Sequence, residues 1–314
     1  MAKNTNIQSN QSVTITGKLS DVVVREGVSK GTNKPYRAGT VTIRVDQTYG
    51  GKQEVSEIPV SFIAMKFKKD GTVNPVYESA GNLTTQFKSI QNYGYDAASR
   101  IRVSGRSGNI SENMFVGRDG EQVVSSWRVN SSFFNPVNGS VESSLANADC
   151  ATFEMDIFIM GMDRECTPEG EETGRLKIRG GVIQYGNRLD VLDFVVEAPT
   201  AVDYIERNYS INDTVKVYGR IRYTSEEVIS DYHEESSWGE VIPKAPSTRV
   251  KRELVIVNGS DEPYDEDMAY APEDIQVIAA DRNNRKEQLK ADNRSKANQK
   301  TAAKAVVSDN YGWE

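Results

Sequence analysis

The first two-thirds of the chain alternates apolar and polar residues over short stretches, which is the pattern of β-strands with one buried face. A helical period appears once among them, at Leu83, Phe87 and Ile90. Asp119 and Gly120 separate two extended stretches and predict a hairpin with a type I′ turn, which needs positive φ at both central positions. In chain order, residues 11–137 give three strands, a helix and two more strands. The extended stretches are Val13–Thr16, Val41–Asp46, Ile58–Ile63, Ile101–Ser104, Asn113–Val116 and Val123–Val129.

The same order of elements recurs further along the chain. A short helix opens at Pro199, where the missing N–H of proline costs nothing, and the stretch Ile101–Arg106 has a counterpart in Val215–Arg220. An acidic insertion, Glu226–Glu240, delays the last strand. The matched order of six elements indicates an internal duplication. The strands of the second copy are predicted at Phe153–Ile159, Arg175–Arg179, Leu189–Val196, Val215–Arg220 and Arg249–Val257.

The last part of the chain has a different composition. Residues 260–267 form an acidic block without a periodic apolar face, which is typical of a solvated linker. Pro272, followed by Glu273 and Asp274, predicts the start of a helix. Residues 281–304 are rich in Lys, Asn, Gln and Ala and have almost no apolar stripe, so they form either a marginal helix or a disordered segment. The chain ends in a polar stretch that carries Tyr311 and Trp313.

Three strands, a helix and two strands is the element order of the OB-fold, a five-stranded Greek-key barrel that binds oligonucleotides or oligosaccharides. We therefore expect a mainly β protein with two tandem OB-fold barrels, each with one helix between its third and fourth strands. The predicted domains are residues 1–140 and 141–258, the second with its acidic insertion at about 226–246. Residues 259–314 are predicted to form an acidic linker and a flexible, partly helical tail.

Charge is unevenly distributed over these 314 residues. The net charge is −7, yet residues 1–140 hold 17 Lys and Arg against 11 Asp and Glu, whereas residues 141–257 hold 13 against 22. A basic first half favours a polyanionic partner for that half. The chain contains no run of the roughly 20 apolar residues that a bilayer span requires. The polar N-terminus lacks a signal peptide, so we expect a cytoplasmic protein without membrane contact.

Signs of catalysis or cofactor binding are missing from the sequence. It has two cysteines, Cys150 and Cys166, and one histidine, His233. It has no phosphate-binding loop, no paired-cysteine metal motif and no nucleophile elbow. Asp261, Asp265 and the nearby acids lack the glycine and terminal glutamate of a calcium loop. We therefore expect neither an enzyme, nor a cofactor, nor a metal site.

The first copy resembles bacterial and bacteriophage single-stranded-DNA-binding proteins. The resemblance is carried by Val103-Ser104-Gly105-Arg106, Asn113-Met114-Phe115, Asp119-Gly120-Glu121 and Ser126-Trp127-Arg128-Val129. In that family the glycine ends the fourth strand, and a charged hairpin leads into a last strand with an aromatic residue. The resemblance implies an acidic tail whose tip recruits replication and repair proteins, here through Tyr311 and Trp313. The chain departs from the bacterial pattern in having two barrels and a Gly-Trp-Glu end. The tetramer of that family therefore cannot be assumed for this chain, and homo-oligomers of other sizes remain open.

Binding single strands without sequence preference requires a positive groove and aromatic faces for the bases. Strand parity places Val41, Ile43, Val45, Ile101 and Val103 inside the barrel and basic residues on the opposite face. Any single basic residue on such a face can equally be an ordinary solvated side chain, and any single aromatic residue can equally belong to the core. For the second copy to bind a polyanion, many of its carboxylates would have to lie in loops, away from the strand face. The candidate DNA-binding residues are Tyr36, Arg37, Arg44, Lys66, Phe67, Lys68, Lys69, Arg100, Arg102, Arg106, Arg118, Trp127, Arg128, Lys177, Arg179, Tyr185, Arg188, Lys216, Tyr218, Arg220 and Arg222.

The sequence thus favours a protein that coats single-stranded DNA in replication, recombination or repair, of bacteriophage type and working in the host cytoplasm. A structural protein of a virion or tail, which uses the barrels as assembly modules, is the alternative. An OB-fold nuclease is a third hypothesis. It would need a buried carboxylate–arginine site, and no motif in the sequence indicates one.

Overall fold

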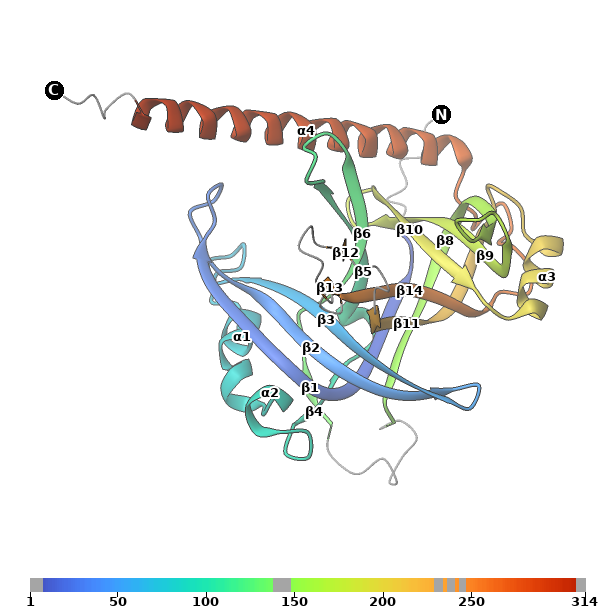
Figure 1. The fold of residues 1–314 in the computed structure, drawn as a ribbon, viewed down its shortest axis with the longest axis horizontal. Coiled ribbons are helices and arrows are strands. Elements are labelled where there is room, and N and C mark those ends of the chain that lie inside the picture. Colours follow the sequence, from blue (N-terminus) through green and yellow to red (C-terminus); the bar gives the residue numbers. More distant parts are fainter. Residues whose placement is uncertain (1–7, 138–147, 229–233, 236–240, 243–246, 309–314) are drawn as a thin grey trace.

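The chain folds into two β-barrels that meet edge to edge, and a long helix lies across both of them (Figure 1). The computed structural model describes residues 8–137, 148–228, 234–235, 241–242 and 247–308. Alternating burial along the strands builds each barrel, as the sequence pattern predicts. Val13, Ile15, Ile43 and Val103 are among the residues with no exposed surface. The fold class inferred from the sequence is confirmed.

The first barrel closes in the order expected of an OB-fold. β1 pairs with β2 and with β4, β2 with β3, and β5 with β6, all antiparallel, while β3 and β6 run parallel. The parallel pair is the Greek-key closure, because it brings the third strand beside the last one. The strands are β1 (Gln11–Val28), β2 (Pro35–Tyr49), β3 (Lys52–Met65), β4 (Arg100–Val103), β5 (Gly108–Val116), β6 (Val123–Ser131) and the short β7 (Asn135–Pro136).

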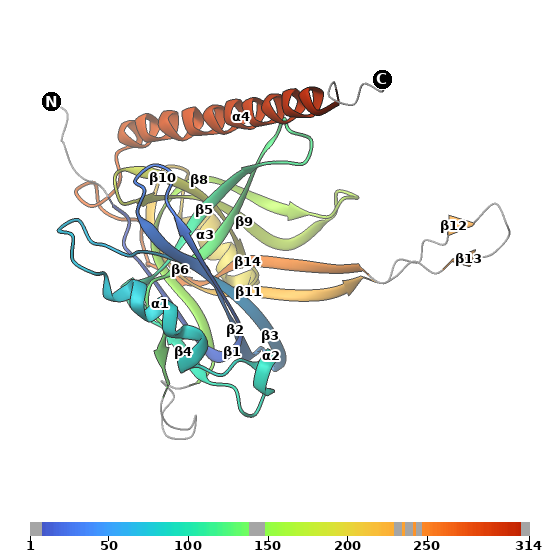
Figure 2. The ribbon, with the colours of Figure 1, turned by 90° about the vertical axis from the view of Figure 1, so that its left-hand side faces the viewer.

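The second barrel repeats this topology. β8 pairs with β9 and β11, β9 with β10, and β11 with β14, all antiparallel, while β10 and β14 are parallel. The hairpin between β11 and β14 extends away from the barrel and carries the small ladder β12–β13 (Figure 2). The strands are β8 (Cys150–Cys166), β9 (Glu172–Gln184), β10 (Arg188–Val196), β11 (Thr214–Val228), β12 (Glu234–Glu235), β13 (Val241–Ile242) and β14 (Ser247–Gly259).

The two barrels share one edge and one core. The first halves of β1 and β8 form an antiparallel ladder in which Val13 faces Phe153. Ile15 faces Val103 on one side, and its counterpart Met155 faces Val217. A single cluster of buried apolar side chains runs through both barrels. The predicted boundary at residue 140 lies among the residues that the structure does not describe.

Helices lie where the sequence predicts them, with different limits. The first is broken into α1 (Pro75–Gln86) and α2 (Ile90–Tyr93), because the chain turns extended at Phe87. α3 (Pro199–Asn208) opens at its proline. α4 (Pro272–Ser308) is one continuous helix of 37 residues, where a marginal or disordered segment was the expectation. Within the described residues, no helix combines the length and the apolar character needed to cross a membrane.

The hairpin between β5 and β6 differs from its prediction in turn type. The amide of Gly120 donates to the carbonyl of Gly117, and only Gly120 has positive φ, at +75°. The turn is therefore an ordinary i to i+3 turn followed by a left-handed glycine, not type I′. The carboxylate of Asp119 accepts hydrogen bonds from the backbone amides of Glu121 and Gln122, and these hydrogen bonds stabilise the observed turn.

Candidate nucleic-acid interface

An open groove of about 550 Å³ lies on the outer face of the first barrel, where β2 and β3 meet the β5–β6 hairpin. We call it the first groove. This is the face that OB-folds use for oligonucleotides. The lining residues are Ala38, Gly39, Ser61, Phe62, Ile63, Ser107, Asn109, Ser111, Arg128, Asn130, Ser131, Ser132 and Arg188.

The first groove is positively charged. Its lining contains two arginines and no carboxylate. Arg128 is exposed and forms no ion pair among the described residues. Arg188 comes from the second barrel, and its guanidinium lies 3.0 Å from the buried carboxylate of Asp190. Desolvation raises the pKa of that carboxyl, although Arg188 and the backbone amide of Glu112 act against this shift.

Neutral polar groups and apolar surface complete the first groove. The side-chain amide of Asn130 donates to Asn109 at 3.0 Å and to Ser111 at 2.8 Å. Ile63 is 64% exposed, and Phe133, which directly follows the lining residue Ser132, is 51% exposed. The groove therefore offers hydrogen-bonding groups and apolar surfaces on which flat bases can lie. Asn109, Ser111, Asn130 and Ile63 were not predicted as site residues, because Asn, Ser and lone apolar residues occur on any strand.

A basic loop follows β3 directly. Lys66, Lys68 and Lys69 form no ion pair with any residue that the structure describes, and Lys66 lies 5.5 Å from the ring centroid of Phe67. Arg118 is exposed on the turn of the β5–β6 hairpin. These described cations, with Arg128, are the predicted site residues whose charge is not already matched by a carboxylate. Their free charge is the property that phosphate binding needs.

Other predicted residues of the first barrel have internal partners. Arg37 pairs with Glu26, donates to the carbonyl of Tyr77 and lies over its ring, so it fastens α1 to the sheet. Arg44 pairs with Asp46, and Arg100 pairs with Asp149.

Two more of the predicted residues of this barrel, Arg102 and Tyr36, contact neighbouring strands. Arg102 donates to the hydroxyl of Thr16 at 2.9 Å. Tyr36 packs against the backbone of Gly27 across the β1–β2 ladder. Arg106 lies in a short turn, and its side chain is outside the described part of the structure.

The second barrel has a groove at the equivalent place, and its charge is different. This second groove, of about 370 Å³, lies between β10 and β14 and contains Glu165, Asp193 and Glu253 beside Lys177 and Arg252. The carboxylates lie on strands, not only in loops as expected from the sequence. Trp127 of the first barrel lines this groove and meets Tyr223 edge to face, with ring centroids 6.4 Å apart. Because of these carboxylates, the second groove does not offer a polyanion the positive surface that the first groove does.

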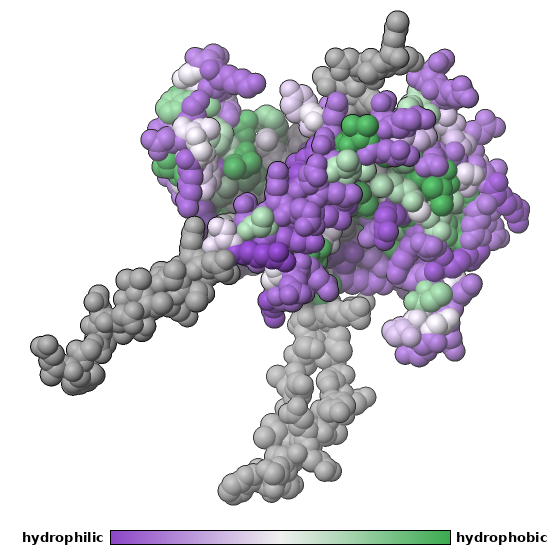
Figure 3. All heavy atoms as spheres, turned by 90° about the horizontal axis from the view of Figure 1, so that it is seen from above, coloured by the Kyte–Doolittle hydropathy of each residue, from purple (hydrophilic) through white to green (hydrophobic). Residues whose placement is uncertain are grey.

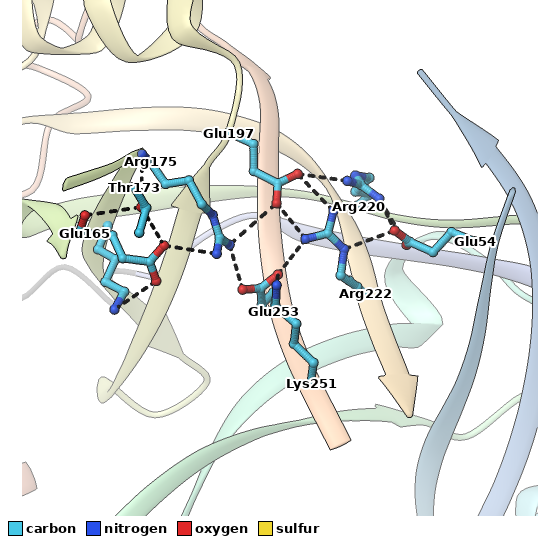
Figure 4. A network of polar contacts seen from close by, with 10 residues as sticks. Glu54, Glu165, Thr173, Arg175, Glu197, Arg220, Arg222, Lys251 and Glu253 are labelled. Atoms are coloured by element: carbon cyan, nitrogen blue, oxygen red, sulfur yellow. Dashed lines mark hydrogen bonds and ion pairs between the residues drawn. The ribbon is translucent and has the colours of Figure 1, made fainter. Parts of the chain in front are cut away.

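Arg220 and Arg222 lie inside a network of ion pairs, which corrects their placement on an exposed face (Figure 4). Arg220 is 8% exposed; it pairs with Glu54 and Glu197, both at 3.0 Å, and lies over the ring of Tyr49. Arg222 pairs with Glu54, Glu197 and Glu253. Glu54 belongs to the first barrel. The alternation of side chains along β11 therefore cannot reveal that the other barrel covers this face of the strand. Hydrogen bonds from Arg222 lower the pKa of Glu197 to about 2.

The other predicted cations of the second barrel are paired as well. Lys177 lies 3.1 Å from Glu165, Arg179 lies 3.4 Å from Asp193, and Lys216 lies 3.0 Å from Glu154. Tyr185 is 85% exposed on a turn and Tyr218 is 36% exposed on β11. The structure does not gather these residues into one surface with the first groove.

Two further predictions concern the partner-binding residues and metal binding. Tyr311 and Trp313 lie outside the described residues. Within the described residues, no group of three His, Cys, Asp or Glu side chains is arranged to hold a metal ion.

Comparison with known proteins gives a family and a distant structural likeness. Residues 9–294 match the family described as YorF. No curated protein sequence matches the chain. Among solved structures, a deletion mutant of the single-stranded DNA binding protein from Thermus aquaticus is similar, at 14% identity and a TM-score of 0.45, with 85% of this chain and 98% of that chain covered. A likeness this distant leaves the function to be inferred from the site.

Proposed function

The chain belongs to the YorF family, and we propose that it binds single-stranded DNA without sequence preference along the first groove. The observation that carries this proposal is the contrast between the two grooves. The first groove has two arginines and no carboxylate, and the second has three carboxylates. Phosphates would be repelled by the second groove and attracted by the first. Binding therefore falls to one barrel of the pair.

The groove suits an unpaired strand better than a duplex. Arg128 supplies a charge for the phosphates, while Ile63 of the lining and Phe133, next in sequence to the lining residue Ser132, supply exposed apolar surface against which unstacked bases can pack. Bases in a duplex are stacked on each other and cannot reach such surfaces. Asn109 and Asn130 hydrogen-bond to each other in the structure, so neither is aimed at a single base. This combination favours binding that tolerates any sequence.

The proposal is tested by fluorescence anisotropy with labelled oligo-dT at several salt concentrations. Arg128→Ala should weaken binding about fivefold to tenfold at low salt and reduce the slope of log Kd against log salt by about 0.7, the value for one lost phosphate contact. Arg207→Ala is the matched control, because Arg207 is an exposed arginine on α3 of the other barrel. Duplex DNA and RNA are measured in parallel. If the wild-type protein binds no oligonucleotide at low salt, or if both variants behave alike, the proposal is wrong.

We also propose that the protein acts in replication, recombination or repair of bacteriophage or host DNA, and that Tyr311 and Trp313 bind partner proteins. The support is the family resemblance of the sequence and the aromatic end of a polar tail. Removing residues 309–314 should leave the affinity for oligo-dT unchanged. A loss of affinity in that truncated protein would contradict a role confined to partners.

A further inference from the structure

Helix α4 begins by docking on the second barrel through apolar contacts. Ile275 and Ile278 are 3% and 8% exposed, and they pack with Tyr270 on Ile183 and Leu189. This contact fixes the direction in which the helix leaves the barrel. From there it passes over the tip of the β5–β6 hairpin, as both ribbon views show (Figures 1 and 2).

From Arg282 onward the side of the helix that faces the barrels carries cations. The half-buried positions are spaced i, i+3, i+4, i+7, i+8 and i+11, which places them on one face. An amphipathic helix normally presents apolar residues on such a stripe, but only one of the six is apolar. The six residues are Arg282, Arg285, Lys286, Leu289, Lys290 and Asn293.

Two of these cations fasten the helix. Arg282 donates two hydrogen bonds to the buried carboxylate of Glu112, which lies on the β5–β6 hairpin. Burial raises the pKa of Glu112, but the hydrogen bonds from Arg282 and Ser125 more than offset it, so the pKa lies below its usual range. Arg285 donates to the carbonyl of Leu189 at 2.8 Å. Helix α4 is thus held to both barrels by polar contacts.

The next two cations face the barrels without a carboxylate from either of them. Within the described residues Lys290 pairs only with Glu287 of its own helix, a largely exposed partner, and such a pair contributes little. Lys286 forms no ion pair in the described structure. Desolvation lowers its pKa, and the nearby charges of Arg282, Lys290 and Arg179 act in the same direction, opposed by Glu112. Cations turned inward and poorly matched indicate a surface made for an anion.

Helix α4 reaches the tip of the hairpin whose base forms a wall of the first groove. The β5–β6 hairpin forms that wall through Asn109, Ser111, Arg128 and Asn130. The side-chain nitrogen of Asn293 lies 3.8 Å from the position that a Cβ on Gly120 would take, at the tip of the same hairpin.

From Arg282 onward the charge of helix α4 is predominantly positive. From residue 282 to residue 308 it holds eight Lys and Arg against two Asp and Glu. Seen from above, its described part forms a mostly hydrophilic ridge across the molecule (Figure 3). A polyanion leaving the first groove over the hairpin would meet this ridge directly.

We propose that Lys286 and Lys290 of helix α4 form a second phosphate-binding surface, which continues the path of a single strand beyond the first groove. This inference rests on the proposed function. It makes the helix part of the DNA site and assigns the tail of the chain a role in binding as well as in recruitment. A short strand would fill the groove alone, and a longer one would reach the helix.

The test compares oligo-dT of about 8 nucleotides, within the site size of one OB-fold, with oligo-dT of about 30. Lys286→Ala together with Lys290→Ala should weaken binding of the long strand about tenfold at low salt and reduce its salt slope by about 1.4, twice the value per phosphate contact. Binding of the short strand should be unchanged. Circular dichroism and thermal unfolding of each variant establish that α4 is still formed.

The control changes the net charge equally on the opposite face of the helix. Asn284 and Gln288 are exposed, so Asn284→Glu with Gln288→Glu also lowers the charge by two while leaving the inner stripe intact. Measured at physiological salt, where screening limits charge effects to about 8 Å, this control should bind both strands nearly as the wild type does. If the two double variants weaken the long strand equally, or if neither does while Arg128→Ala still weakens both strands, the helix inference is wrong and the proposed function stands. If the wild type binds neither strand, both fail.

Discussion

At the scale of the residue, strand parity predicts burial and says little about partners. Val41, Ile43 and Val45 were expected inside the first barrel, and each is at most 1% exposed. Arg220 and Arg222 were expected on an open face by the same reasoning, but Glu54 of the other barrel covers them. Parity decides to which side of a sheet a side chain points, and only the three-dimensional structure decides what lies there.

The ion-pair network should stabilise the protein in a pH-dependent way. Because the pKa of Glu197 falls from 4.5 to about 2 on folding, its contribution is full above pH 4.5 and is lost as the pH falls toward 2. Glu197→Gln leaves two nearly buried arginines partly unpaired, so the free energy of unfolding should drop by about 2 kcal/mol at pH 7. Thermal unfolding from pH 7 to pH 3 should show this difference shrinking.

The matched variant is Glu206→Gln, which breaks the more exposed pair with Arg164. Its effect should be much smaller than that of Glu197→Gln, because an exposed ion pair contributes little to stability. Equal destabilisation by both variants at pH 7 would contradict the importance of the network.

At the scale of the element, the sequence predicts type better than extent. The hairpin of β5 and β6 was recognised from Asp119 and Gly120, yet its turn needs one positive φ where two were expected. Helix α4 was underestimated because the expected signal was an apolar stripe, whereas its inner face is held by Arg282 and Arg285. Charged contacts with distant strands leave no periodic trace in the sequence.

Gly120 should be the conformationally demanding position of that hairpin. An alanine there has ordinary space, since the nearest atom is 3.8 Å from its Cβ, but it must keep a φ of +75°. Gly120→Ala should therefore lower the free energy of unfolding by about 1 kcal/mol through backbone strain alone. Gly31→Ala is the control, because Gly31 lies in an open turn without positive φ. Denaturant unfolding curves compare the two, and a neutral Gly120→Ala would disprove the strain.

At the scale of the whole molecule, the duplicated OB-fold was predictable and the difference in charge between the grooves of its two halves was not. Six elements in repeated order indicate two barrels. Which barrel keeps a positive groove depends on carboxylates such as Glu165 and Asp193, whose positions beside Lys177 and Arg179 follow from strand register. The first groove itself combines residues of both barrels, because Arg188 lines it.

The shared core predicts that the two barrels unfold together. One cluster of buried apolar side chains spans both, and the β1–β8 ladder joins their sheets. Scanning calorimetry of the full chain should give a single transition whose calorimetric and van't Hoff enthalpies agree. Two resolved transitions would show that the barrels are independent domains despite this ladder.

The ladder between β1 and β8 has one more consequence. Val13 and Phe153 occupy corresponding places in the two halves and face each other, so the halves meet as two copies of one subunit do about a dyad. Covalent fusion keeps each half at a high effective concentration for the other, however scarce the protein is in the cell. Dilution, which dissociates an ordinary dimer, therefore cannot separate the half that bears the open groove from the half that supports it.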